Sequence, residues 1–235
     1  MAIASRVELA EVRAEIEALE AFQNMGEDGL DSLCRMARCH DYPRGNILHY
    51  KGDTDDAIYM VIRGKVKVVL TSEEGREVVI DLLRSGDLLG LVAAVNRSPH
   101  PAHAITATES RLAKFKREPF LAWVESQGLV VDLVWQQLAQ RVRHAYARIG
   151  EHVLLDVKAR LMLTLLEIAE HEGHPASEGD EIVFTRPTHR ELAERIGSSR
   201  EVVTRLLSEL LESDLLNAEG RVIRVPYSAL ILREE

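Results

Sequence analysis

Apolar residues between Thr188 and Leu210 repeat at helical spacing in two short segments. The first segment opens with Thr188 and, three residues later, Glu191, which is the signature of a capping box at the start of a helix. Gly197 follows, and glycine readily adopts the left-handed conformation that ends a helix. Each segment has one apolar face, made of Leu192, Ala193 and Ile196 in the first and of Val203, Leu206, Leu207 and Leu210 in the second. The pattern predicts two short helices joined by a tight turn.

The outer face of the second predicted helix is polar and carries Arg200, Glu201, Thr204 and Arg205. A helix that buries its aliphatic residues and projects two arginines suits the major groove of DNA. A solvated surface, on which Glu201 only forms a capping box with Ser198, is the alternative. A Glu219-Gly220 turn followed by the alternating residues 221–225 predicts a β-hairpin wing, which favours the DNA-reading interpretation.

The middle of the chain, from Tyr42 to about Phe115, has a different pattern of short β-rich runs separated by glycines. Strands are predicted at residues 58–62, 66–70, 78–83 and 105–115. Many short strands with turn signals this close together are typical of a compact antiparallel sandwich or barrel.

Helical periodicity returns after Glu118 and predicts a long helical region that ends shortly before Asp156. Asp156 is the predicted N-cap of a further helix over 157–170. A loop over 171–180 and a strand over 181–185 are predicted to follow. In the helical region before Asp156, apolar or small residues recur at intervals of three and four: Val131, Val134, Leu138, Val142, Ala145, Ile149 and Val153. This seam, about three heptads long, could pack against its own domain, but a parallel homodimer accounts for it better.

The charge of the chain limits how it can bind nucleic acid. The formal net charge is −9, and the part from Asp156 onward holds 10 Lys and Arg against 16 Asp and Glu. Any DNA contact must therefore come from a local basic patch, for which the candidates are Arg186, Arg190, Arg195, Arg200 and Arg205. Such a protein is expected to bind non-specific DNA weakly and to be sensitive to salt.

Other function classes find little support in the sequence. No run approaches the ~20 apolar residues of a membrane span, and a signal-peptide pattern is missing, so a cytoplasmic protein without a membrane partner is expected. Two cysteines, Cys34 and Cys39, are too few for an iron–sulfur cluster held by thiolates alone, and are expected to be small buried hydrophobes rather than a redox switch. Nucleophile-elbow, phosphate-loop and zinc-protease motifs are also missing, so an enzyme is not expected.

The order of helix, β-barrel, long helix and winged helix-turn-helix resembles the CRP/FNR family of bacterial transcription regulators, from about residue 25 to the end. The stretches that carry the resemblance are RGNILHYKGDTDDAIYMVIRGKVKVVL, RSGDLLG, LLDVKARL and TRPTHRELAERIGSSREVVTRLLSELLESDLL. Apolar residues spaced among charged neighbours predict an N-terminal helical segment over 1–24. After it, the resemblance implies an α+β fold with a cyclic-nucleotide-binding-like β-roll or jelly roll (25–127), a coiled-coil dimerisation helix (128–155) and a winged helix-turn-helix domain (156–235).

The resemblance also implies which residues read DNA. Arg200, Glu201 and Arg205 match the R-E-x-x-x-R arrangement of the catabolite-activator branch, in which the arginines contact guanines and the glutamate a cytosine of TGTGA-like half-sites. The chemistry agrees, because arginine fits the paired acceptors of guanine and a carboxylate accepts from the amino group of cytosine. Thr188, His189 and Ser199 occupy positions that contact phosphate in that branch. At the position of His189 the family usually has an arginine.

The sensor region departs from the cyclic-AMP branch. Leu91 stands where that branch has the ribose-binding glutamate, and His100 and Pro101 replace its phosphate-binding Arg-Ser pair. Without those charge-assisted hydrogen bonds, cyclic AMP is not the expected ligand. A less charged effector, or none, fits the apolar candidate pocket, formed by Leu91, Val92, His100, His103, Ala145 and Tyr146.

These inferences predict a homodimeric, sequence-specific transcription regulator whose partners are double-stranded DNA and a second copy of the chain. RNA polymerase and a small-molecule effector are further candidate partners from the resemblance. A haem- or metal-based gas or redox sensor on the same scaffold is the alternative, with His100, His103 or the two cysteines as its chemical site, because one axial histidine can hold haem. A His-x-x-His pair without a third ligand assigns no metal site, and the cofactor stays open.

Overall fold

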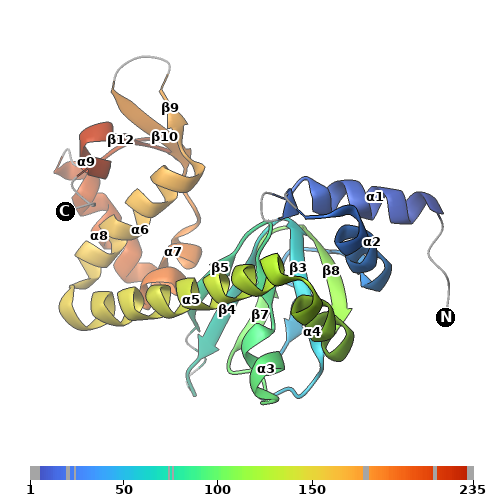
Figure 1. Ribbon diagram of the computed structural model, residues 1–235. Helices are drawn as coiled ribbons and strands as arrows, with labels where there is room; N and C mark the ends of the chain where they lie inside the picture. Colours follow the sequence, from blue (N-terminus) through green and yellow to red (C-terminus); the bar gives the residue numbers. More distant parts are fainter. Residues whose placement is uncertain are drawn as a thin grey trace. The chain divides into compact units, whose positions relative to one another are not determined.

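The computed structural model describes residues 6–19, 22–23, 25–73, 75, 77–176, 180–213 and 216–231 (Figure 1). The chain divides into two compact units, one of residues 1–70 with 80–146 and the other of residues 71–79 with 147–235. Parts of the predicted segments lie outside the described residues: positions 1–5, 20–21 and 24 of the N-terminal helical segment, positions 74 and 76 of the β-roll over 25–127, and positions 177–179, 214–215 and 232–235 of the domain over 156–235, the first of these within the loop over 171–180.

Two four-stranded sheets build the cyclic-nucleotide-binding-like part of the chain. Their strand orders are β1-β8-β3-β6 and β2-β7-β4-β5, with antiparallel pairing. The strands are β1 (Arg38–Tyr42), β2 (Ile47–His49), β3 (Ala57–Arg63), β4 (Val66–Thr71), β5 (Glu77–Leu83), β6 (Leu88–Leu89), β7 (His103–Thr106) and β8 (Ser110–Lys116). The expected antiparallel sandwich is confirmed, and so are the strands predicted at 58–62, 66–70 and 78–83.

The single strand predicted over 105–115 is wrong, because the chain turns between β7 and β8. In this turn Thr108 Oγ1 and Ser110 Oγ accept hydrogen bonds from Lys65 N at 2.9 and 3.2 Å. The backbone of Gly64, with φ of 92°, passes so close to Ser110 that a Cβ there would lie 2.4 Å from its hydroxyl oxygen. The polar side chains of the turn thus bind the β3–β4 connection instead of continuing a strand.

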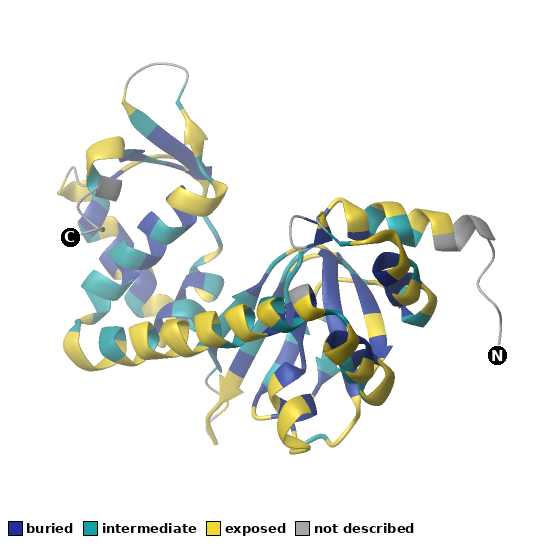
Figure 2. Ribbon diagram, viewed as in Figure 1, coloured by how far each residue is buried: buried dark blue, intermediate teal, exposed yellow. Residues whose placement is uncertain are grey.

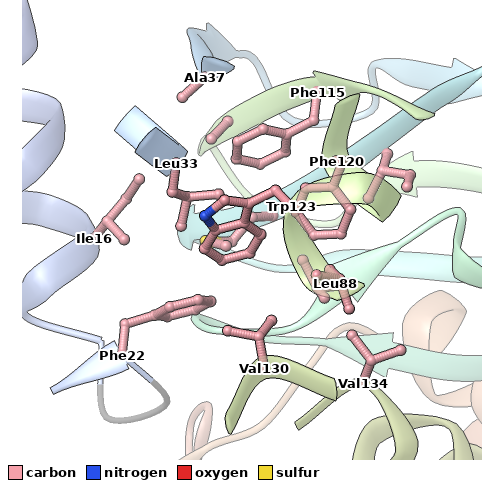
Figure 3. Close-up of a cluster of buried hydrophobic side chains, with 14 of the residues drawn as sticks. Ile16, Phe22, Leu33, Ala37, Leu88, Phe115, Phe120, Trp123, Val130 and Val134 are labelled. Carbon is pink, nitrogen blue, oxygen red and sulfur yellow. The ribbon is translucent and has the colours of Figure 1, made fainter. Parts of the chain in front are cut away.

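Helices pack around this sandwich and share its largest core. They are α1 (Arg6–Glu17), α2 (Glu27–Met36), α3 (Leu91–Asn96), α4 (Arg117–Ser126) and the first part of α5 (Gly128–Leu154). Figure 3 shows Trp123 among Phe22, Phe115 and Phe120, with Val130 and Val134 of α5 beside them. The indole Nε1 of Trp123 donates to the carbonyl of Gly29 at 3.1 Å, which pairs the one polar group of this buried ring.

The second unit holds the predicted winged helix-turn-helix. It consists of the last part of α5 and of α6 (Val157–Glu172), β9 (His174–Pro175), β10 (Glu181–Thr185), α7 (His189–Ile196), α8 (Arg200–Glu212), β11 (Asn217–Glu219), β12 (Val222–Pro226) and α9 (Tyr227–Ile231). Asp156 is the N-cap of α6, as predicted, and accepts from Ala159 N at 2.7 Å. The wing is confirmed as the β11–β12 hairpin, which joins β10 and β9 in one sheet.

Among the described helices, none is both long enough and apolar enough to cross a membrane.

Candidate DNA-binding face and effector region

Local hydrogen bonds fix both ends of the turn between α7 and α8. Thr188 Oγ1 accepts from Glu191 N at 3.3 Å, and the Glu191 carboxylate accepts from Thr188 N at 2.7 Å, which confirms the capping box. Gly197 ends α7 with φ of 64°. Ser199 is the N-cap of α8 and accepts from Val202 N at 3.3 Å. The buried faces of the two helices, Leu192, Ala193 and Ile196 against Val203, Leu206, Leu207 and Leu210, belong to one apolar core.

The structure gathers the predicted DNA-reading residues on the first turns of these helices. Ser199, Arg200, Glu201 and Arg205 are exposed on α8, and Thr188 is exposed at the start of α7. The Arg205 guanidinium lies 3.7 Å from Glu209, but its side chain is 69% exposed, and exposed ion pairs contribute little to stability. Its donors can therefore exchange this partner for a base edge.

Glu201 is held in its ionised form by its neighbours. Its own backbone N–H, the Ser199 hydroxyl and the positive charge of Arg200 lower the pKa of its carboxyl group. A carboxylate at this position is an acceptor only, which is the property that pairing with the amino group of cytosine requires.

Contacts between elements add details that the sequence did not reveal. His189 Nδ1 lies 2.7 Å from Thr204 Oγ1, which connects α7 to α8. Arg221, in the wing turn, donates from Nη2 to the carbonyl of Arg186 at 3.1 Å, and burial and the charge of Arg221 lower the pKa of Arg186. In the predicted basic patch, Arg190 pairs with Glu194 at 3.0 Å on its own helix. The sequence signal that could have pointed to this contact is the position of Arg221 directly after Gly220, in the turn of the predicted wing.

The two halves of the predicted α5 seam have different environments. Val134 is buried in the core of the first unit, and Val131 and Leu138 pack partly against it. The positions further along the seam, which are Val142, Ala145, Ile149 and Val153, are exposed. Figure 2 shows the later turns of this long helix coloured mostly as exposed. Trp135 and Tyr146 are exposed as well, Tyr146 by 71%.

A second face of α5 is polar and binds the backbone near β6. Gln137 accepts from Leu88 N at 2.9 Å through Oε1 and donates to Gly86 O at 3.0 Å through Nε2. One helical turn later, Arg141 donates to Leu88 O and lies 3.7 Å from the carboxylate of Asp81. Because β6 is an edge strand, its open backbone groups would otherwise lack partners. The side chains of α5 thus take the place of a neighbouring strand.

The candidate effector residues lie in several different environments. Leu91 is fully buried in the core that contains Met60 and Phe120, whereas Val92 is partly exposed and Tyr146 lies on the exposed stripe of α5. His103 Nδ1 accepts from Lys51 N at 3.1 Å. A buried apolar leucine cannot replace the acceptor that cyclic AMP needs for its ribose hydroxyl, so the residues present do not fit that ligand.

His100 is buried and stacks on His49, a residue that the sequence analysis missed. Their ring centroids are 3.7 Å apart with an interplanar angle of 14°. Burial and the proximity of His100 lower the pKa of His49 to about 4, so its ring is neutral at neutral pH. Among the described residues, His49 Nδ1 and His100 Nε2 find no hydrogen-bond partner, and a carboxylate oxygen of Asp55 lies 3.6 Å from His100 Nε2. In the described part of the chain, no three His, Cys, Asp or Glu side chains are grouped to hold a metal ion.

Of the two cysteines, which were both expected to be buried, Cys34 is buried and Cys39 is only partly buried. Burial raises the pKa of Cys34, and it raises the pKa of Cys39 to about 11. Because the thiolate is the reactive form of cysteine, neither side chain is activated for redox chemistry at neutral pH.

Known proteins match both parts of the chain. The cyclic nucleotide-binding domain family model matches residues 39–127, and the Crp-like helix-turn-helix domain model matches residues 159–230. A CRP-like cAMP-activated global transcriptional regulator of Mycobacterium tuberculosis is 26% identical over 213 residues, which are 90% of this chain and 94% of the relative. The cAMP-activated global transcriptional regulator CRP of Salmonella typhimurium is 28% identical over 190 residues, 79% and 88% of the two chains.

Solved structures agree with these matches. A CRP/FNR family transcriptional regulator of Thermus thermophilus has a TM-score of 0.66 and 27% identity, over 84% of this chain and 99% of that one. The c-di-GMP responsive global regulator CLP of Xanthomonas campestris has the same fold, with a TM-score of 0.71 and 24% identity over 86% and 99%. Together with the helix-turn-helix face, these findings define a DNA-binding transcription regulator rather than an enzyme. The chain belongs to the CRP/FNR family.

Proposed function

We propose that the protein reads a TGTGA-like palindrome as a homodimer, with α8 of each copy in the major groove. The observation that carries this proposal is the exposed cluster of Arg200, Glu201 and Arg205 on a helix that is capped at its start and buried on its other face. Arginine pairs with guanine and glutamate with cytosine in the major groove. Thr188 and Ser199, exposed at the two helix starts, are the proposed phosphate contacts.

A second copy of the chain is the proposed partner of α5. Trp135, Val142, Tyr146, Ile149 and Val153 are exposed and follow one another in steps of seven, four, three and four, which is the spacing of a coiled-coil stripe. Large apolar side chains in one continuous stripe gain stability when a like surface covers them. Parallel pairing of α5 would give the two-fold symmetry that a palindrome requires, with recognition helices about 34 Å apart. The segment proposed for dimerisation is 128–155, between a sensor domain of 25–127 and a DNA-binding domain of 156–235.

Cyclic AMP, named for several relatives, is not the proposed effector. Leu91 fills the core where the resemblance places the ribose acceptor, and an apolar side chain offers no acceptor to a hydroxyl group. We propose a regulator whose effector differs from cyclic AMP or that needs none. The haem or metal alternative keeps one supporting observation, the unpartnered nitrogens of the His49–His100 stack, and a visible absorption band in the purified protein would distinguish it.

The DNA-reading proposal is tested by comparing Arg205→Ala with Arg190→Ala, which removes an equal charge from a residue paired on α7. Arg205→Ala is expected to weaken binding to the TGTGA palindrome by about 1–3 kcal/mol and to relax the preference over a scrambled duplex. Arg190→Ala should leave that preference unchanged. Fluorescence anisotropy with labelled duplexes measures both, and equal losses of Arg205→Ala on the two duplexes would contradict base reading.

A further inference from the structure

His189 occupies the first position of α7, where the family usually has an arginine that contacts phosphate. Its ring is half-buried, and its Nδ1 lies 2.7 Å from Thr204 Oγ1 on α8. Histidine differs from arginine in one decisive property, because its charge changes near neutral pH. Whether the imidazole ring of His189 can bind a phosphate therefore depends on whether the ring is neutral or protonated.

The hydrogen bonds around Thr204 determine where the proton of the neutral ring sits. The Thr204 hydroxyl donates its single proton to the carbonyl of Arg200 at 2.9 Å. It must then accept from His189, so Nδ1 carries the ring proton. In the neutral ring Nε2 is consequently an acceptor, and a phosphate oxygen, which also only accepts, cannot bind to it. Protonation turns Nε2 into a charged donor while the bond to Thr204 is kept.

The charges that face His189 in the free protein oppose this protonation. Arg186 lies on the segment before α7 and Arg200 on α8, and burial, together with both of these charges, lowers the pKa of His189. The next charged residues along its own helix are Arg190, which pairs with Glu194, and Glu191, which accepts from Thr188. A DNA phosphate placed against this group would reverse the balance, because a nearby negative charge favours the protonated ring.

We propose that His189 binds a backbone phosphate of double-stranded DNA through its protonated ring, so that DNA binding takes up a proton on each protomer. The proposal rests on the DNA-reading function proposed above and adds a pH dependence to it. The ring is more basic in the complex than in the free protein. The affinity for DNA therefore rises as the pH falls from the pKa of His189 in the complex to its pKa in the free protein. Above and below that interval the affinity does not change with pH.

Two substitutions separate this contact from other effects of pH. His189→Gln keeps an amide donor for Thr204 but cannot become charged, and His189→Arg is charged at every pH used. Binding is measured by fluorescence anisotropy between about pH 5.5 and 8 at constant ionic strength, because histidine titrates in this range. The wild-type affinity is expected to rise toward low pH by as much as about tenfold per pH unit for each protomer, with a clearly smaller change in His189→Gln. His189→Arg should bind more tightly than wild type at the highest pH.

The same pH dependence is expected on a scrambled duplex, since phosphate contacts carry no sequence information. Calorimetry in two buffers of different ionisation enthalpy should also show a proton uptake that His189→Gln loses. Equal pH profiles for wild type and His189→Gln would overturn the proposal. A second outcome separates the two proposals. If the wild type binds the palindrome and the scrambled duplex equally, while its affinity still depends more on pH than that of His189→Gln, the base-reading function is overturned and the His189 contact is supported.

Discussion

In the proposed function, single side chains determine both what α8 would present to DNA and what the β-roll could bind. Arg200, Glu201 and Arg205 are available because Val203 and Leu207 bury the opposite face of the helix and Ser199 caps its start. At the position of the ribose acceptor in the cyclic-AMP branch, Leu91 is buried completely. On the proposed function, the scaffold would keep the chemistry of a base-reading helix, while core packing by Leu91 would replace a ligand contact.

The burial of Leu91 makes a prediction for stability. Leu91→Ala should lower the free energy of unfolding by about 2–5 kcal/mol, because it leaves a cavity in a packed core. The neighbouring Val92 is partly exposed, and Val92→Ala should cost less than half as much. Urea denaturation followed by circular dichroism measures both. A loss at Leu91 no larger than at Val92 would mean that Leu91 lines an open pocket.

At the scale of elements, α5 performs two tasks with two faces. Its polar side chains Gln137 and Arg141 bind the β6 backbone, and its exposed apolar stripe is the proposed dimer surface. The heptad spacing predicted such a stripe, but the sequence alone could not show that Val131 and Val134 pack in their own unit. Their neighbours in that core, such as Phe22 and Trp123, come from distant parts of the sequence.

The exposed stripe of α5 predicts the effect of a single charge. Val142→Asp places a carboxylate in the proposed dimer interface and should convert the dimer to a monomer, with loss of tight binding to the palindrome. Gln140→Asp adds the same charge on the same helix, outside the stripe, and should leave the dimer intact. Analytical ultracentrifugation measures the mass of each variant. A Val142→Asp monomer that still binds the palindrome tightly would refute the role of dimerisation.

Elements fixed by local residues could be predicted from the sequence, and elements fixed by distant contacts could not. Caps and periodic faces are local, so Thr188, Gly197, Asp156 and the strands at 58–62 and 66–70 could be predicted from the sequence. The break between β7 and β8 could not, because it depends on hydrogen bonds from a distant backbone group to Thr108 and Ser110. The His189–Thr204 and His49–His100 contacts were missed for the same reason, since each joins two separate elements.

For the whole molecule, net charge and symmetry limit how DNA can be bound. A chain with a formal net charge of −9 gains little from general attraction to a polyanion. Affinity must therefore come from a few local contacts, which Arg200, Arg205 and a protonated His189 would supply in each protomer. Two copies related by a two-fold axis double these contacts only on a site with the matching spacing. The selectivity for the palindrome therefore depends on the geometry of the proposed dimer.

The most direct test of this claim uses the unmodified protein and three labelled duplexes in fluorescence anisotropy. One carries the TGTGA/TCACA palindrome, one has its spacer lengthened by half a helical turn, about five base pairs, and one is scrambled. We expect tight binding to the first duplex and much weaker binding to the other two, with no change when cyclic AMP is added. Equal affinity for all three duplexes, with or without cyclic AMP, would contradict the claim.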